Sequence, residues 1–145
     1  MVTIATFATV TPSVLIDALR IVSGLVLLSA GLAKLRVGPI AFARAILGYR
    51  LVPAGIASAL ARTLPVAEII LGTFLLTGAF VPVATITSAG LVIAFSGAVS
   101  IALLRRQRNA CGCGIGASEP VSWSLLVRNA VLLGALVVVY VSWEV

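Results

Sequence analysis

The chain contains four apolar stretches, each long enough to cross a lipid bilayer as an α-helix. A spanning helix needs roughly 20 apolar residues, and the stretches occupy residues 14–33, 56–79, 83–104 and 121–143. Of the 145 residues, 61% are hydrophobic and only 10% are charged, and the mean hydropathy is +1.25. This composition is typical of a membrane protein. We therefore predict an all-α fold, a four-helix integral membrane bundle that forms a single transmembrane domain over residues 1–145.

A shorter helix is predicted between the first two stretches. Gly38-Pro39 precedes it and Gly48-Tyr49 follows it, which is the usual placement of proline and glycine at helix ends. The segment is too short to span a bilayer, and Arg44 and Arg50 lie beside its apolar residues. We expect this helix to lie at the membrane interface.

The basic residues follow the first and third stretches. They are Lys34, Arg36, Arg44 and Arg50 in one connection, and Arg105, Arg106 and Arg108 in the other. The segment before residue 14, the turn at 78–82 and the C-terminal end carry none. In a membrane protein, a net charge of +6 distributed in this way marks the cytoplasmic side and does not indicate a nucleic-acid partner. We predict a multi-pass protein of the inner membrane, with both termini outside and the second basic loop in the cytoplasm.

Two cysteines, Cys111 and Cys113, lie one residue apart in this second loop, and the chain has no other cysteine and no histidine. The glycines between and after them let the backbone bend, and Arg105, Arg106 and Arg108 favour the reactive thiolate. A disulfide in so small a ring should be readily reduced.

Three interpretations of the cysteine pair stay open: a redox-active dithiol, which we favour, a soft-metal site for an ion such as Cu(I), and two silent thiols. Two thiolates without histidine leave a zinc shell incomplete, so no metal ligands are assigned. A cytoplasmic location is awkward for a protein that forms disulfides, because the cytoplasm is reducing.

Polar residues also occur inside the apolar stretches. Glu68 lies in the second stretch, and Arg128 and Asn129 lie about two turns into the fourth. A carboxylate in lipid should face the bundle interior and find a partner. Arg128 or Asn129 could supply it, and Lys34 at the same end of the first stretch competes with them. The pair could lock helices together or handle a ligand or proton.

Small residues suggest where the helices pack closely. Such residues would let neighbouring helices approach. They are Ser23, Gly24, Ser29, Ala30 and Gly31 in the first stretch, and Ser88, Gly90, Ser96, Gly97 and Ser100 in the third. We expect both groups to face other helices of the bundle.

Taken in order, several short motifs resemble the MauE family of membrane proteins, relatives of the broader DoxX-like group. The motifs are Ser29-Ala30-Gly31-Leu32-Ala33-Lys34-Leu35, the Gly-Tyr and Leu-Val-Pro within residues 42–53, Leu64-Pro65-Val66-Ala67-Glu68, Cys111-Gly112-Cys113-Gly114, and Ser122-Trp123 ahead of Arg128-Asn129. The resemblance implies a four-helix membrane bundle that acts in methylamine utilisation and helps to form disulfides in the small subunit of methylamine dehydrogenase. It also implies a thioredoxin-like partner.

In outline such a bundle is similar to DsbB and vitamin K epoxide reductase, which pass electrons to a quinone through Cys-x-x-Cys pairs. This chain has Cys-x-Cys spacing and lacks a second pair. These departures count against an internal disulfide relay and against quinone chemistry. Quinone nevertheless stays open as a cofactor, and no cofactor is assigned.

Three function classes follow. The first is a membrane thiol–disulfide oxidoreductase component that exchanges electrons through Cys111 and Cys113 with a thioredoxin-like or other redox protein, within membrane lipid. The second is a non-catalytic anchor or assembly subunit of a larger redox or transport complex. The third is a soft-metal binding protein that would hold its ion through the two thiols. The cysteine pair favours the first class, and the missing second pair favours the second.

Overall fold

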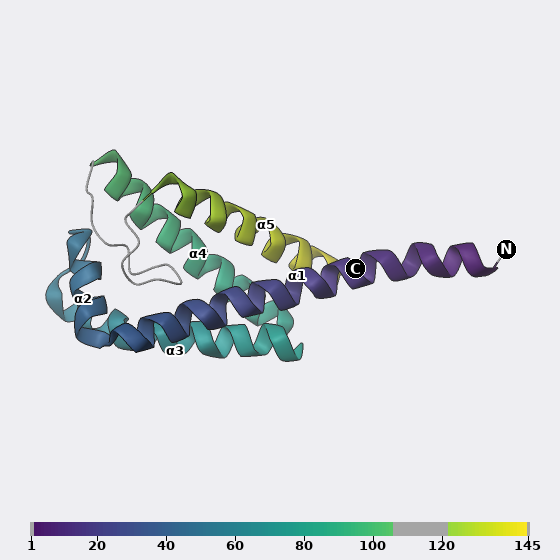
Figure 1. Cartoon of the computed structure of the whole chain (residues 1–145), viewed down its shortest axis with the longest axis horizontal. Coiled ribbons are helices and arrows are strands. Elements are labelled where there is room, and N and C mark those ends of the chain that lie inside the picture. Colours follow the sequence, from purple (N-terminus) through teal and green to yellow (C-terminus); the bar gives the residue numbers. More distant parts are fainter. Residues whose placement is uncertain (1, 106–121, 145) are drawn as a thin grey trace.

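The structure is a computed structural model that describes residues 2–105 and 122–144, and the described residues form α-helices joined by short turns (Figure 1). The helices are α1 (Val2–Val37), α2 (Pro39–Gly48), α3 (Ala54–Thr77), α4 (Val81–Leu104) and α5 (Trp123–Glu144). Four of them contain segments long and apolar enough to cross a membrane: Ser13–Val37, Ala54–Thr77, Val81–Leu104 and Trp123–Trp143. The predicted all-α bundle with four candidate spans is confirmed, with helix ends within about four residues of those expected at most positions.

Helix α1 is longer than the sequence predicted, because the helix begins at Val2 and continues to Val37 instead of covering residues 14–33. Its N-terminal part projects beyond the other helices (Figure 1). At the other end, Lys34 and Arg36 occupy its last turn, where cations interact favourably with the helix dipole. Counting Lys34 as a loop charge was therefore wrong, since its side chain is only 3% exposed and points into the bundle.

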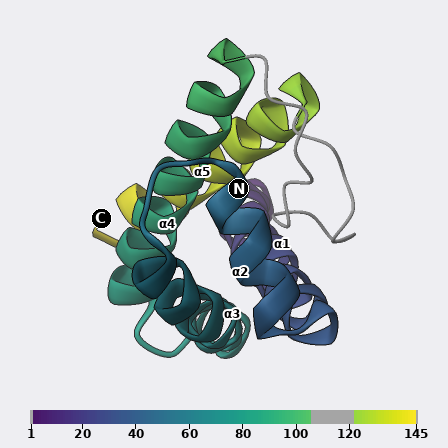
Figure 2. The ribbon, with the colours of Figure 1, turned by 90° about the vertical axis from the view of Figure 1, so that its left-hand side faces the viewer.

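The short helix predicted between the first two spans is present as α2, and it crosses the end of the bundle (Figure 2). Gly38 has a φ of +88°, a value that favours glycine, and Pro39 is the first helical residue. The helix buries Phe42 against the spanning helices and ends where Tyr49 turns inward. Thus α2 contributes side chains to the bundle interior.

Helices α1 and α3 pack at backbone distance. A Cβ atom built on Gly24 would lie 2.9 Å from the Gly72 carbonyl oxygen, and one on Gly31 would lie 2.8 Å from the Pro65 carbonyl oxygen. Nothing larger than glycine fits at either crossing without a shift. The expectation of close packing holds for this helix. On α4 it holds for Ser88, which is fully buried, but not for Gly90 and Gly97, whose added Cβ atoms would meet nothing within 4 Å.

The far end of α3 is capped by a side chain from α1. Arg20 donates hydrogen bonds to the carbonyl oxygens of Leu75 and Leu76, and it also pairs with Asp17 at 3.2 Å. Since the last carbonyls of a helix have no partner within the helix, this arginine satisfies acceptors that α3 itself leaves unpaired.

Candidate functional site

A buried ion pair joins α1 to α3. The Nζ atom of Lys34 lies 2.6 Å from both carboxylate oxygens of Glu68, and each residue is only 3% exposed. Of the three partners considered for Glu68, the structure therefore brings Lys34 into contact. A bidentate bond of this kind gives the carboxylate a charged partner within an apolar stretch.

The glycine crossing explains how the two side chains meet. Lys34 lies three residues after Gly31, whose missing side chain lets α1 approach Pro65 and Glu68 on α3. An added Cβ on Gly31 would lie 3.2 Å from the Glu68 Cβ. The ion pair and the close crossing are thus parts of one packed contact.

Two aromatic rings complete the surroundings of Lys34. Its Nζ lies 5.8 Å from the centroid of the Phe42 ring and 5.2 Å from that of the Phe95 ring. These rings come from α2 and α4, and a cation over an aromatic face is attracted to it. Lys34 is consequently the point at which four helices of the bundle meet.

A small cavity of about 40 Å³ lies beside the pair. Lys34 and Glu68 line it together with Arg128 and Asn129 of α5. Asn129 donates a hydrogen bond from Nδ2 to the Ser96 Oγ at 3.2 Å, which ties α5 to α4. The cavity has room for a water molecule and polar groups to hold one. All four polar residues singled out within or beside the apolar stretches therefore gather at one place, with Lys34 and Glu68 buried and Arg128 and Asn129 half-buried.

The cysteine pair is not part of this described geometry. Cys111 and Cys113 lie outside the described residues, as do Arg106 and Arg108. Arg105 is described and is exposed at the end of α4.

Sequence reasoning missed an apolar pocket of about 340 Å³ between α2, α3 and α4. Phe42 and Phe95 separate this pocket from Lys34, because each ring lines the pocket and also contacts the ammonium group. Tyr49 is the one lining residue with a polar side-chain atom. No sequence signal predicts it, since a pocket depends on how three helices diverge.

Comparisons with known proteins identify similar chains. The family model described as Methylamine utilisation protein MauE matches residues 12–142. The Methylamine utilization protein MauE of Paracoccus denitrificans is 35% identical over 117 residues, which cover 79% of this chain and 62% of that protein. The chain thus spans about three fifths of the length of the curated relative it matches. No solved structure matches it.

Proposed function

The chain belongs to the MauE family, and from this premise we propose that it is a membrane-embedded thiol–disulfide exchange component of a methylamine utilisation system. One observation carries the proposal: the chain's two cysteines lie one residue apart, in the connection between two candidate membrane spans. The chain has no histidine and no other thiol, so redox exchange by its own side chains is confined to Cys111 and Cys113. The names of the family and of the Paracoccus relative point to the pathway.

The proposed reaction is a two-electron exchange with a thioredoxin-like partner. The thiolate of one cysteine attacks the partner's disulfide, so that a mixed disulfide forms and a partner thiolate leaves. The second cysteine then attacks the mixed disulfide, which releases the partner dithiol and leaves a Cys111–Cys113 disulfide. The reverse sequence oxidises the partner, and neither direction needs a further reactant. The arginines that precede the pair, beginning with Arg105, favour the thiolate.

The bundle supports this role by fixing the helix ends that carry the loop. Near the end of α4, Val99 and Ala102 pack against Tyr49, and Leu125 near the start of α5 joins the same buried cluster. The Lys34–Glu68 pair holds α1 to α3 beneath them. We propose that these contacts set the separation of the two helix ends and so restrict where the cysteine loop can reach.

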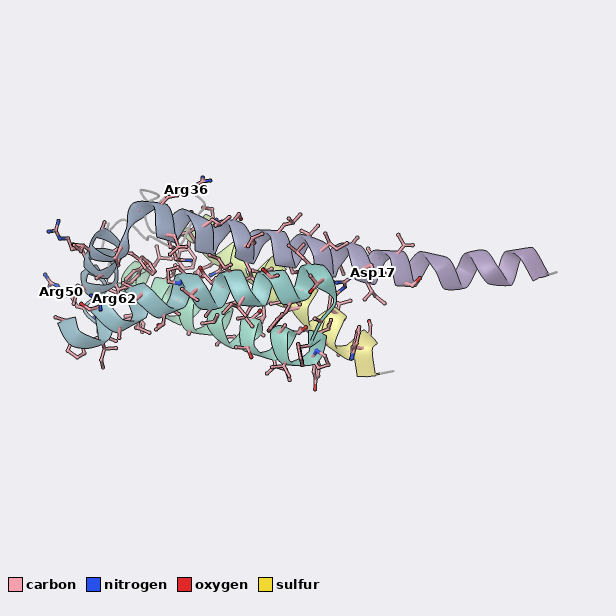
Figure 3. The ribbon with its side chains drawn as sticks, turned by 90° about the horizontal axis from the view of Figure 1, so that it is seen from below. Asp17, Arg36, Arg50 and Arg62 are labelled. Carbon is pink, nitrogen blue, oxygen red and sulfur yellow. The ribbon has the colours of Figure 1, made fainter. Side chains whose placement is uncertain are left out.

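We also propose that the loop faces the cytoplasm from the inner membrane. Exposed arginines at one end of the bundle support this orientation: Arg36, Arg44, Arg50, Arg62 and Arg105. Figure 3 places Arg36, Arg50 and Arg62 toward that end and Asp17 toward the other. The positive-inside rule assigns the basic end to the cytoplasm. A membrane-impermeant maleimide should then label Cys111 and Cys113 only after cells are opened, and labelling in intact cells would contradict the orientation.

The exchange is tested by trapping its mixed disulfide in cells. With Cys111→Ser or Cys113→Ser, the remaining thiol cannot be resolved internally, so one of the two single variants should accumulate a disulfide-linked adduct with a thioredoxin-like protein. Non-reducing gels and mass spectrometry identify the adduct. The double serine variant should form none and should lose methylamine-dependent growth.

A matched control asks whether any thiol in the loop suffices. Ser118→Cys in the double serine background restores a cysteine to the same loop, but it should restore neither the adduct nor growth. If the double serine variant grows on methylamine as well as the parent, the exchange proposal is wrong.

A non-catalytic membrane subunit is the second candidate, and one observation favours it. Gly90 and Gly97 lie on an exposed face of α4 that also carries Ile86 and Ile93, with open space at both glycines. Small residues in lipid-facing positions allow another membrane helix to approach closely. Under this candidate Gly90→Leu would abolish growth on methylamine, whereas the double serine variant would not.

A further inference from the structure

The apolar pocket between α2, α3 and α4 has the dimensions of a ligand site. Its volume of about 340 Å³ falls at the lower end of the range of roughly 300–1,000 Å³ for small-molecule pockets. Leu60 and Leu64 of α3 form one wall, and Leu91 of α4 also lines the pocket. A pocket of this size and lining accepts a hydrocarbon chain or ring and offers almost nothing to a polar ligand.

The pocket is open toward the surroundings of the helices. Leu51 at the turn before α3 is 40% exposed, and Ala94 on α4 is exposed as well. Because α3 and α4 are both candidate membrane spans, the medium outside this opening is lipid. A chain from the bilayer can therefore enter sideways.

Arginines lie at the outer end of the pocket. Arg50 is exposed and sits between Tyr49 and Leu51, which both line the pocket. Arg105 follows Ala98 by seven residues, or two helical turns, which places it on the pocket face of α4 at the end of the helix. Tyr49, which follows α2, and Ala102 near the end of α4 belong to one buried cluster, so both segments lie at the same end of the bundle.

We propose that this pocket binds one acyl chain of an anionic phospholipid, whose phosphate lies between Arg50 and Arg105. Charge complementarity selects this occupant: an apolar slot that ends at two guanidinium groups matches an acyl chain that ends at a phosphate. Basic pockets between membrane helices are sites where anionic head groups bind. The other exposed arginines of α2 and α3, Arg44 and Arg62, fall two residues from lining positions and so point to the opposite helix faces.

The bound chain would also touch the core of the bundle. Phe42 and Phe95 would have the acyl chain on one side and the Lys34 ammonium on the other. An occupied pocket would hold both rings in place over Lys34. This site does not depend on the cysteines, so its test and that of the proposed exchange have separate outcomes.

The test uses the full chain in lipid nanodiscs and a photoreactive lipid. Phosphatidylglycerol with a diazirine in the middle of one acyl chain is the probe, and phosphatidylcholine with the same chain is its neutral match. Peptide mass spectrometry should locate phosphatidylglycerol crosslinks at Leu91, Phe95 and their neighbours on α3. Phosphatidylcholine should crosslink there at least threefold less.

Matched variants separate the tail from the head group. Ala94→Phe fills the opening and should reduce crosslinking at the pocket about tenfold, whereas Ala130→Phe on an exposed position of α5 should not. Arg50→Gln combined with Arg105→Gln should remove the preference for phosphatidylglycerol, whereas Arg36→Gln should retain it, since Figure 3 shows Arg36 on the α1 side, apart from Arg50.

Ala98→Val provides a second, milder filling of the pocket if Ala94→Phe fails to fold, and it should lower crosslinking severalfold. Equal labelling by the two lipids would overturn the proposal. Crosslinking at the pocket that survives both filling variants would also overturn it. The same holds if an isoprenoid quinone co-purifies and must be removed before the lipid probe crosslinks to the pocket.

Discussion

The two sides of α3 are packed in different ways. Toward α1, glycines let the backbones touch, because a Cβ added at Gly72 would lie 2.8 Å from the Gly24 carbonyl oxygen. A buried ion pair also joins the two helices. Toward α2 and α4, large apolar side chains leave a pocket of about 340 Å³. In lipid, apolar surface alone gives helices little reason to associate, so tight contacts need small residues or polar partners. The α1–α3 side has both, whereas the pocket side has alanines on α4 but no ion pair and no glycine at a backbone crossing among its lining residues.

The largest effect is expected from breaking the ion pair. Glu68→Gln leaves the Lys34 ammonium buried beside a neutral amide, and removing one partner of a buried pair costs about 3–5 kcal/mol. We expect the free energy of unfolding, measured by SDS titration in detergent micelles, to fall by about this amount. Asp17→Asn is the control, because its exposed pair with Arg20 should contribute at most about 1 kcal/mol.

A double variant then distinguishes a lock from a working charge. Lys34→Met with Glu68→Leu removes both charges together, and such apolar replacements are often neutral. If stability returns and methylamine-dependent growth returns with it, the pair is structural. Restored stability without growth would assign the charges a role in handling a ligand or proton. The two sides of α3 would then differ in function as well as in packing.

The next effect should come from the glycine crossing. Gly72→Ala adds a Cβ that would lie 2.8 Å from two backbone atoms of α1, so the helices must separate, and overpacking typically costs about 1–3 kcal/mol. Gly90→Ala is the matched control, because it meets nothing within 4 Å and gains helix propensity of up to about 1 kcal/mol. Equal changes in the two unfolding midpoints would mean that the α1–α3 contact is not tight.

The fold could be read from the sequence because it depends on the lengths of apolar segments. Four runs of about 20 residues specify four spans, and Gly38-Pro39 specifies where the short helix begins. The family was also recognisable from motifs, and the comparisons confirm it. Which glycines face a neighbour was not recoverable: Gly24 and Gly90 look alike in sequence, yet one meets a backbone and the other meets open space. Helix orientation decides this, and α4 is apolar on every side.

The candidate site was predictable in its members but not in its pairing. A charged residue in an apolar stretch signals an interior position, which identified Glu68 and Arg128. The choice of Lys34 as the partner of Glu68 depended on α1 continuing to Val37, since a helix that ended at residue 33 would have left Lys34 in a loop. The bonds from Arg20 to the end of α3 were not predictable, because they depend on how the two helices are aligned.

The smallest effect is expected at the pocket side and appears as a dependence on alkaline pH. Burial raises the pKa of Tyr49 from 10.0 to about 12, because the apolar surroundings disfavour the phenolate. Between pH 10 and 12 the unfolded chain therefore loses this proton while the folded chain keeps it, so stability is complete below pH 10 and falls as the pH rises toward 12. One pKa unit corresponds to about 1.4 kcal/mol, so the loss of stability between pH 9 and 11 should be about 1 kcal/mol.

Tyr49→Phe should remove that part of the pH dependence of stability, while Tyr140→Phe on α5 should retain it. If Tyr49→Phe and the parent lose stability in parallel as the pH rises, the phenol is solvated through the open pocket. The pocket side of α3 would then be less tightly packed than the burial of Tyr49 indicates.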